Sequence, residues 1–159
     1  MNHWLRLKAF TERNRDLVFE VIRIYLGLGL FAKGVYFAGH TGAVISLLDR
    51  GAVDVPGVML AHTIALAHLA GGLLVAAGLL TRLAAAVQVP ILLGAVFLVH
   101  LREGLFGASQ NLEFALLVLF LLALTVVYGG GRWSADWFLA RRQALLSGGP
   151  RPREVNGTA

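Results

Sequence analysis

Residues 17–39 form an apolar stretch that is long enough to cross a lipid bilayer, yet this stretch carries Glu20, Arg23 and Lys33. A membrane-spanning helix needs about 20 residues, each of which adds about 1.5 Å to its length. A charged side chain at the bilayer centre costs about 3 kcal/mol on insertion scales, so it usually faces a bundle interior or a water-filled cavity. The three charges therefore predict polar partners on other helices and mark a candidate functional site.

The composition is that of an integral membrane protein. Only 14% of the 159 residues are charged and 57% are hydrophobic, whereas about 25% of the residues in a soluble domain are charged. The absence of cysteine excludes thiol redox chemistry and iron–sulfur ligation by this chain alone. The net charge of +5 comes from basic residues that flank apolar stretches, which indicates topology and anionic lipid rather than nucleic acid.

Four stretches are long and apolar enough to span the membrane, and they predict an all-α protein with a four-helix transmembrane bundle within residues 17–137. A half-helix or surface helix is expected at residues 41–48, and Pro90 should kink the third span and free a carbonyl group. The predicted spans cover about residues 18–38, 58–80, 83–101 and 112–129.

Both ends of the chain predict segments outside the bilayer. Residues 1–16 mix basic and apolar side chains, as an amphipathic segment on a membrane surface would. Residues 138–146 predict a short amphipathic surface helix, preceded by Trp133 and Trp137 as interface anchors. The composition of residues 147–159 is typical of a disordered tail.

Basic residues are distributed unevenly between the two sides of a four-span chain. The loops on one side hold two, Arg50 and Arg102, whereas eight lie near the spans on the side of both termini. Because cytoplasmic loops carry an excess of Lys and Arg, we expect both termini in the cytoplasm and the chain in the cytoplasmic (inner) membrane. The eight are Arg6, Lys8, Arg13, Arg15, Arg82, Arg132, Arg141 and Arg142.

Small residues form one stripe along the second predicted span, and His68 lies on it. Small side chains at helical spacing let a neighbouring helix approach closely, so this stripe predicts a packing seam. The stripe consists of Ala61, Ala65, His68, Gly72 and Ala76.

Polar side chains of the predicted spans sort into two layers by depth, and each layer offers partners for a buried charge. The ligand-pocket candidates lie toward the outer leaflet, and the other layer lies toward the inner leaflet. The outer layer contains Lys33, Tyr36, His40, His62, His100 and Glu113, with His68 near the midplane. The inner layer contains Glu20, Arg23, Gln88, Thr125 and Tyr128.

Two interpretations of these layers stay open. In one, the outer layer lines a pocket for a small polar or quinone-like molecule, with Lys33 and Glu113 as charged anchors and histidines as proton donors and acceptors. In the other, Lys33–Glu113 and Glu20–Arg23 are ion pairs that fix the helix register.

His62 and His100 are expected at similar depth on different helices, which raises the question of a bis-histidine haem or a metal. We do not expect either, because a histidine at a membrane interface is commonly hydrated. The sequence also contains no phosphate loop, nucleophile elbow or zinc motif, so hydrolase and nucleotide chemistry have little support.

Motifs distributed over most of residues 20–137 resemble those of the DoxX/DoxD-like membrane proteins. They are Arg23-Ile24-x-Leu26-Gly27 followed by Lys33-Gly34, Gly71-Gly72-Leu73-Leu74 followed by Gly78-Leu79-Leu80-Thr81-Arg82, Asn111-Leu112-Glu113-x-Ala115-Leu116-Leu117, and Gly129-x-Gly131-Arg132-x-Ser134-x-Asp136. At His68 the sequence departs from the pattern, since many relatives have Glu before the Gly-Gly pair.

The resemblance implies a four-helix bundle in the cytoplasmic membrane and association with a redox system. DoxD-like chains form a subunit of a thiosulfate:quinone oxidoreductase, and DoxX chains are linked to thiol or oxidative-stress defence. The motif residues that it carries over to this chain are Arg23, Lys33, Arg82, Glu113, Arg132 and Asp136.

The leading functional hypothesis is a redox-associated membrane subunit that binds a quinone or another lipid-soluble molecule. A separate membrane or peripheral chain, or another copy of this one, would be its partner, and a separate chain would carry the electron-transfer cofactor. Whether this chain is itself an enzyme stays open. The alternatives are a structural or assembly subunit without a ligand and a small-solute transporter.

Overall fold

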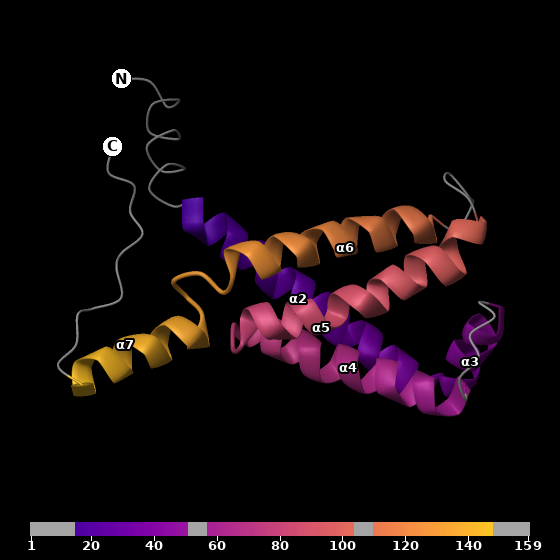
Figure 1. Cartoon of the computed structure of the whole chain (residues 1–159), viewed down its shortest axis with the longest axis horizontal. Helices are drawn as coiled ribbons and strands as arrows, with labels where there is room; N and C mark the ends of the chain where they lie inside the picture. Colours follow the sequence, from indigo (N-terminus) through magenta and orange to yellow (C-terminus); the bar gives the residue numbers. More distant parts are fainter. Residues whose placement is uncertain (1–14, 51–56, 104–109, 148–159) are drawn as a thin grey trace, which may run out of the picture.

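The computed structural model describes residues 15–50, 57–103 and 110–147, and every regular element in these ranges is helical. Most of the amphipathic segment predicted for residues 1–16, and nearly all of the predicted tail, lie outside these ranges. Four long helices lie along the molecule in alternating directions (Figure 1). They are α2 (Arg15–Gly39), α4 (Gly57–Ala77), α5 (Thr81–Gly94) and α6 (Asn111–Tyr128).

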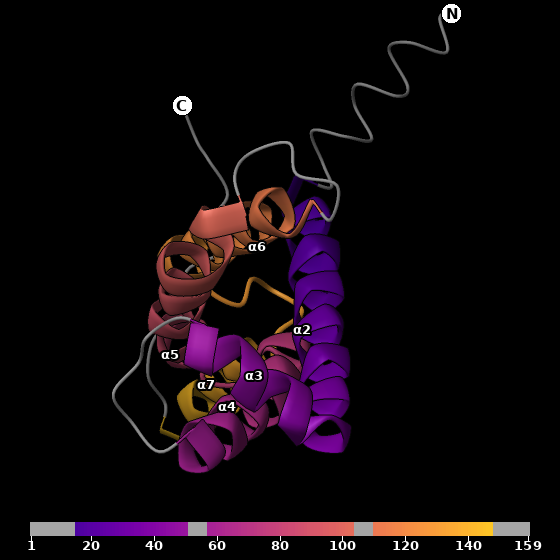
Figure 2. The same cartoon turned by 90° about the vertical axis from the view of Figure 1, so that its right-hand side faces the viewer.

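Two shorter helices occupy the two ends of this arrangement. Helix α3 (Thr41–Arg50) follows α2 at one end, where the sequence predicts a half-helix or surface helix. Helix α7 (Ala135–Ser147) lies at the opposite end, beyond the end of α6 (Figure 1). Viewed along the long axis, α2 and α5 lie on opposite sides of the molecule, and α3 lies in front (Figure 2).

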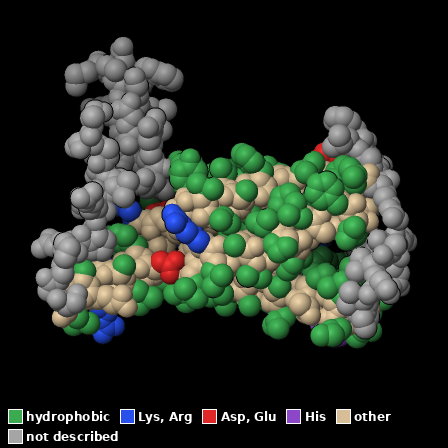
Figure 3. Space-filling view, in the orientation of Figure 1, with side chains coloured by type: hydrophobic (Ala, Val, Ile, Leu, Met, Phe, Trp, Pro, Cys, Tyr) green, Lys and Arg blue, Asp and Glu red, His purple; other side chains and the backbone are tan. Residues whose placement is uncertain are grey.

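Within the described part of the chain, three helical segments are long and apolar enough to cross a membrane: Gly57–Ala77, Thr81–Val99 and Asn111–Tyr128. Hydrophobic side chains are distributed over the whole visible surface between the two ends, where charged side chains are few (Figure 3). Tyr25, for example, is 78% exposed and Leu66 is 66% exposed. A soluble monomer rarely exposes apolar patches of this extent, whereas lipid covers them in a bilayer. The chain is therefore an all-helical membrane protein.

Helix α4 ends at Ala77, three residues before the end of the span predicted for residues 58–80. Gly78 and Leu80 adopt left-handed backbone conformations, with φ of 72° and 48°, and this turn reverses the chain into α5. Pro90 lies inside α5, and the helix continues to Gly94 before it widens into the π-helix η1 (Ala95–Val99) and the 3₁₀-helix η2 (His100–Glu103).

Helices α2 and α4 are in backbone contact along the seam that the small-residue stripe predicts. A Cβ atom on Gly27 would lie 2.7 Å from the Cα atom of Ala76, and one on Gly34 would lie 2.6 Å from the backbone nitrogen of Leu69. Ala61 and His68, which belong to the stripe, are buried. The stripe therefore faces α2, and glycines on both helices make the close approach possible.

One apolar core joins all four long helices. Leu30 comes from α2, Val75 from α4, Ala85 from α5 and Leu122 from α6, and all four are buried. Within this core Gln88 is fully buried, and its Nε2 atom donates a hydrogen bond to the carbonyl oxygen of Ala67 at 2.6 Å. This bond connects α5 to α4, so Gln88 acts as a polar contact between helices.

Candidate functional site

Polar side chains gather at two places at opposite ends of the long helices. The first, which we call the arginine network, consists of Glu20, Arg23, Thr81, Ser134 and Asp136 and lies next to α7. The second, which we call the lysine cluster, consists of Lys33, Tyr36, Phe37 and His68 and lies toward α3.

Arg23 is only 3% exposed and binds the end of a neighbouring helix. Its Nη1 atom donates to the carbonyl oxygens of Val75 at 2.8 Å and Ala76 at 3.1 Å. These carbonyl groups belong to the last turn of α4, where the carbonyl oxygen of Val75 also accepts the Gly78 N–H at 3.2 Å, and a helix C-terminus favours positive charge. Arg23 therefore caps α4 from α2.

Glu20 lies one helical turn before Arg23 and holds the segment that follows α6. It is 4% exposed, and its Oε1 atom accepts a hydrogen bond from the backbone N–H of Trp133 at 2.8 Å. Gly131 lies against the same carboxylate with a φ of 73°, and a Cβ atom there would be 2.9 Å from Oε1. The sequence predicts a Glu20–Arg23 pair, and the structure gives each residue backbone partners on other segments.

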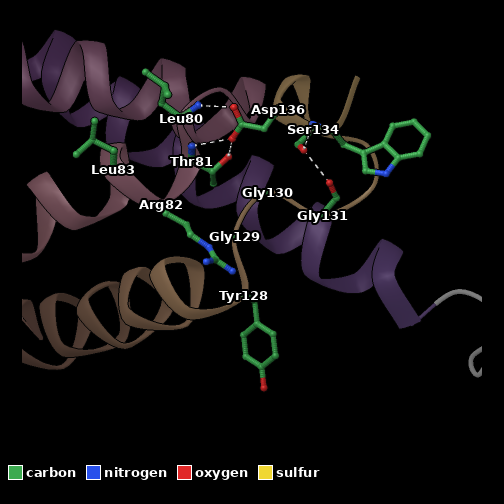
Figure 4. A pocket seen from close by; sticks show the side chains of 11 residues that line it. Leu80, Thr81, Arg82, Leu83, Tyr128, Gly129, Gly130, Gly131, Ser134 and Asp136 are labelled. Atoms are coloured by element: carbon green, nitrogen blue, oxygen red, sulfur yellow. Dashed lines mark hydrogen bonds between the residues drawn. The ribbon is translucent and has the colours of Figure 1, made fainter. Parts of the chain in front are cut away.

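Asp136, at the start of α7, caps the N-terminus of α5 (Figure 4). Its Oδ1 atom accepts from the Leu80 N–H at 2.7 Å, and its Oδ2 atom accepts from the N–H and the hydroxyl group of Thr81, both at 3.0 Å. Its own N–H donates to the carbonyl oxygen of Gly78 at 3.0 Å. The hydroxyl group of Ser134 accepts the Trp137 N–H at 3.2 Å and so caps α7 in turn.

The surroundings of the Asp136 carboxyl group have opposing effects on its pKa. Partial burial raises the pKa of Asp136, but the hydrogen bonds from Thr81 and Leu80 and the positive charge of Arg23 outweigh it and hold the pKa below its ordinary value. The ionised carboxylate is thus the form that the folded protein prefers.

An open pocket of about 480 Å³ lies between the start of α5, the end of α6 and the start of α7 (Figure 4). Arg82 is on its wall and donates from Nη2 to the carbonyl oxygen of Val127 at 3.2 Å. Tyr128, also on the wall, is exposed and stacks on Phe19 with ring centroids 5.0 Å apart. The predicted inner layer therefore divides among four places: the arginine network, this surface stack, the contact of Gln88 with α4, and α6 itself, where the Thr125 hydroxyl group donates to the carbonyl oxygen of Leu121 at 2.8 Å.

The lysine cluster joins an exposed cation to a buried histidine through one aromatic ring. The Nζ atom of Lys33 lies 5.2 Å from the ring centroid of Phe37 and 5.8 Å from that of Tyr36. Phe37 also contacts His68, whose ring packs edge-on with the ring centroids 5.4 Å apart. His68 is buried, and its Nδ1 atom donates to the carbonyl oxygen of Ile64 at 2.9 Å, which leaves Nε2 as the acceptor of a neutral ring.

The remaining outer-layer candidates are His40, which contacts the cluster, and His62, His100 and Glu113. His62 is exposed on α4, with Nδ1 bonded to the carbonyl oxygen of Val58 at 2.7 Å. His40 stacks on Tyr36 at 4.3 Å. His100 begins η2 and Glu113 lies in the first turn of α6, two elements that pack against each other. The Lys33–Glu113 pair stays a prediction. In residues 15–50, 57–103 and 110–147, no three His, Asp or Glu side chains gather as a metal site would require.

The sequence did not predict how the segment from residue 129 to 136 folds back. Family motifs pointed to Asp136, but its contact with Thr81 and the contact of the Trp133 N–H with Glu20 were missed. One local signal was available. The glycines at 129 and 131 permit positive φ, which they adopt, and a Ser two residues before Asp136 is typical of a helix N-cap.

Comparison with known proteins gives one family. The DoxX family matches residues 18–101, which is more than half of the chain and includes Arg23, Lys33, His68 and Arg82. No curated protein and no solved structure matches the chain. The three apolar helices and this match agree with each other, and the chain belongs to the DoxX family.

Proposed function

We propose that this DoxX-family protein is a membrane subunit of a redox system and that it binds a quinone, or a lipid-soluble molecule of similar shape, at the lysine cluster. The observation that carries the proposal is the position of Lys33. Its side chain is exposed on α2 and its Nζ atom lies near the rings of Tyr36 and Phe37, and buried His68 packs edge-on against Phe37.

The chemistry of the cluster matches that of a quinone. A quinone ring is flat and apolar, so it can stack on Tyr36 or Phe37, and its carbonyl oxygens accept hydrogen bonds. The Lys33 ammonium group has three N–H donors and lies beside these rings. A charge at membrane depth is costly without an acceptor, and a bound carbonyl oxygen would reduce this cost.

Electron transfer would belong to a separate chain. Reduction of a quinone to a quinol takes two electrons and two protons, and this chain contains no cysteine for thiol or iron–sulfur chemistry. The partner would supply the electrons from its own cofactor, while this subunit holds the quinone in reach. Such a division of work is what the resemblance to DoxD-like subunits of a thiosulfate:quinone oxidoreductase implies.

We further propose that α2 is a fourth membrane span and completes a four-helix bundle in the cytoplasmic membrane. Helix α2 has 25 residues and shares the apolar core with α4, α5 and α6. Its exposed side chains between the arginine network and the lysine cluster are mostly apolar, as lipid contact requires. With four spans, the excess of Arg and Lys places both termini in the cytoplasm.

Quinone binding can be measured directly on the purified protein. Isothermal titration with short-chain ubiquinone and menaquinone analogues is expected to give saturable binding, which Lys33→Met and His68→Leu weaken by about tenfold or more, the loss of one charge-assisted contact. His62→Leu replaces an exposed histidine of the same helix and should leave the affinity unchanged. Equal affinity in all four proteins, each with an unchanged melting temperature, would contradict quinone binding at the lysine cluster.

A structural or assembly subunit is the second candidate. The wide apolar surface favours it, since Val21, Tyr25 and Leu28 on α2 are more than half exposed and could pack against another membrane protein. Copurification of a larger complex, combined with a Lys33→Met variant that melts earlier but binds quinone as wild type does, would favour this candidate.

A further inference from the structure

The open pocket beside α7 lies at the level where the apolar spans end. One candidate span begins at Thr81 and another ends at Tyr128, and both residues line the pocket. Trp137 also lines it, and Trp133 nearby is largely exposed. Tryptophans are enriched where headgroups meet hydrocarbon, so the pocket faces the headgroup layer of the bilayer.

Arg82 lies on the wall of this pocket, at the depth of the lipid headgroups. The bond from Nη2 to the carbonyl oxygen of Val127 fixes the side chain, which has five N–H donors in all. Gly129 lets it lie against the backbone, since a Cβ atom there would be only 3.0 Å from Nε. Figure 4 shows Arg82 next to Gly129 and Tyr128, whereas Asp136 is turned toward Thr81.

Asp136, the acidic residue in the pocket lining, already accepts hydrogen bonds from the protein. Both oxygens of Asp136 accept hydrogen bonds from Leu80 and Thr81, and Arg23 acts on the same carboxylate. Arg141 is held by the protein as well, since its guanidinium carbon lies 5.2 Å from the ring of Trp137. Among the residues that line the pocket, Arg82 supplies the positive charge, and its remaining N–H donors favour an anion from outside the chain.

Apolar side chains continue from the pocket onto the outside of the spans. Leu83 on the pocket wall is 61% exposed, and Val87 lies exposed one turn further along α5. An inorganic anion would gain nothing from these residues, whereas an acyl chain would bury against them.

We propose that this pocket binds an anionic phospholipid. The phosphodiester group contacts Arg82, whose planar donors match phosphate oxygens, and an acyl chain follows Leu83 and Val87 along α5. The bound lipid fixes the depth of α5 and α6 in the bilayer. This proposal does not depend on quinone binding, since the lysine cluster lies at the opposite end of the helices.

Lipid titration in an uncharged detergent, followed by native mass spectrometry, tests the site. Dioleoylphosphatidylglycerol is expected to bind at least about tenfold more tightly than dioleoylphosphatidylcholine, as one charge-assisted phosphate contact at an arginine allows. Arg82→Gln should remove this preference and Arg82→Lys should keep part of it. Arg142→Gln is the matched control, because Arg142 is exposed on α7 outside the pocket lining.

A second variant distinguishes the loss of a lipid contact from a folding defect, which Arg82→Gln alone would not do. Leu83→Glu changes an exposed side chain and places a negative charge on the proposed acyl path, so it should abolish the preference for phosphatidylglycerol without lowering the melting temperature. The proposal is overturned if Arg142→Gln weakens binding as much as Arg82→Gln does, if Leu83→Glu binds as wild type does, or if glycerol phosphate alone binds as tightly as the intact lipid.

Discussion

Arg23 and Lys33 lie on the same helix and meet two different surroundings. Arg23 is buried, and its Nη1 atom donates to carbonyl groups at the end of α4, so the protein supplies partners for one end of this guanidinium group, whereas its Nε atom is buried without a hydrogen bond to any described residue. Lys33 is exposed and contacts aromatic rings of its own helix. This contrast is why we assign a structural role to Arg23 and a ligand-binding role to Lys33.

Asp136→Asn is expected to lower the free energy of unfolding by about 1 kcal/mol at pH 7, the typical cost of losing a helix cap. Because the pKa of Asp136 is lowered in the folded protein, its stabilisation is complete above the ordinary aspartate pKa of about 3.9 and is lost as the pH falls through the lower folded value. Thermal unfolding in detergent should therefore show a larger gap between variant and wild type at pH 7 than at pH 3. An equal gap at both pH values would contradict this role.

At the scale of elements, the α2–α4 pair leaves little room for larger side chains at its contact. Its helices touch through backbone atoms at Gly27, Gly34 and Gly72, and His68 is buried beside this seam. Since Lys33 is on α2 and His68 is on α4, the spacing of the two helices also sets the geometry of the lysine cluster.

Two glycines of α2 give a matched test of this seam. A Cβ atom on Gly27 would press on Ala76 and on the carbonyl oxygen of Gly72, so Gly27→Ala should destabilise the protein by about 1–3 kcal/mol, the usual cost of overpacking. Gly29 has open space where its Cβ atom would be, so Gly29→Ala should be neutral or stabilise slightly through helix propensity. Equal melting temperatures of the two variants would show that the contact between α2 and α4 at Gly27 can accommodate a Cβ atom.

Features that depend on local sequence could be predicted, and features that depend on chain reversal could not. Hydropathy predicted the membrane class, and small-residue spacing predicted the buried face of α4 that carries Ala61 and His68. The bond between Glu20 and Trp133 joins residues 113 positions apart, and it exists because glycines with positive φ turn the chain back after α6. No periodicity in the sequence reports such a contact.

At the scale of the whole molecule, the two polar regions define two functional ends. The end next to α7 contains the arginine network and the pocket at Arg82, and the end toward α3 contains the lysine cluster. We propose that these ends lie near opposite surfaces of the bilayer, with α2 spanning the distance between them.

The cysteine-free sequence allows a direct test of this arrangement. Single cysteines at Thr11→Cys, Ser46→Cys and Leu146→Cys report on the chain before α2, on α3 and on α7. In intact cells a membrane-impermeant maleimide is expected to label position 46, and to label positions 11 and 146 only after lysis. Labelling of position 11 together with position 46 would show that α2 does not cross the membrane.

The central claim, that the lysine cluster binds a quinone, is tested most directly by photolabelling in native membranes. An azidoquinone should label peptides that contain Lys33 to Phe37 and peptides around His68, and excess unlabelled quinone should prevent this labelling. The Lys33→Met variant should lose most of the label at both places. Labelling that is spread along all helices, or that excess quinone and Lys33→Met leave unchanged, would contradict the proposed site.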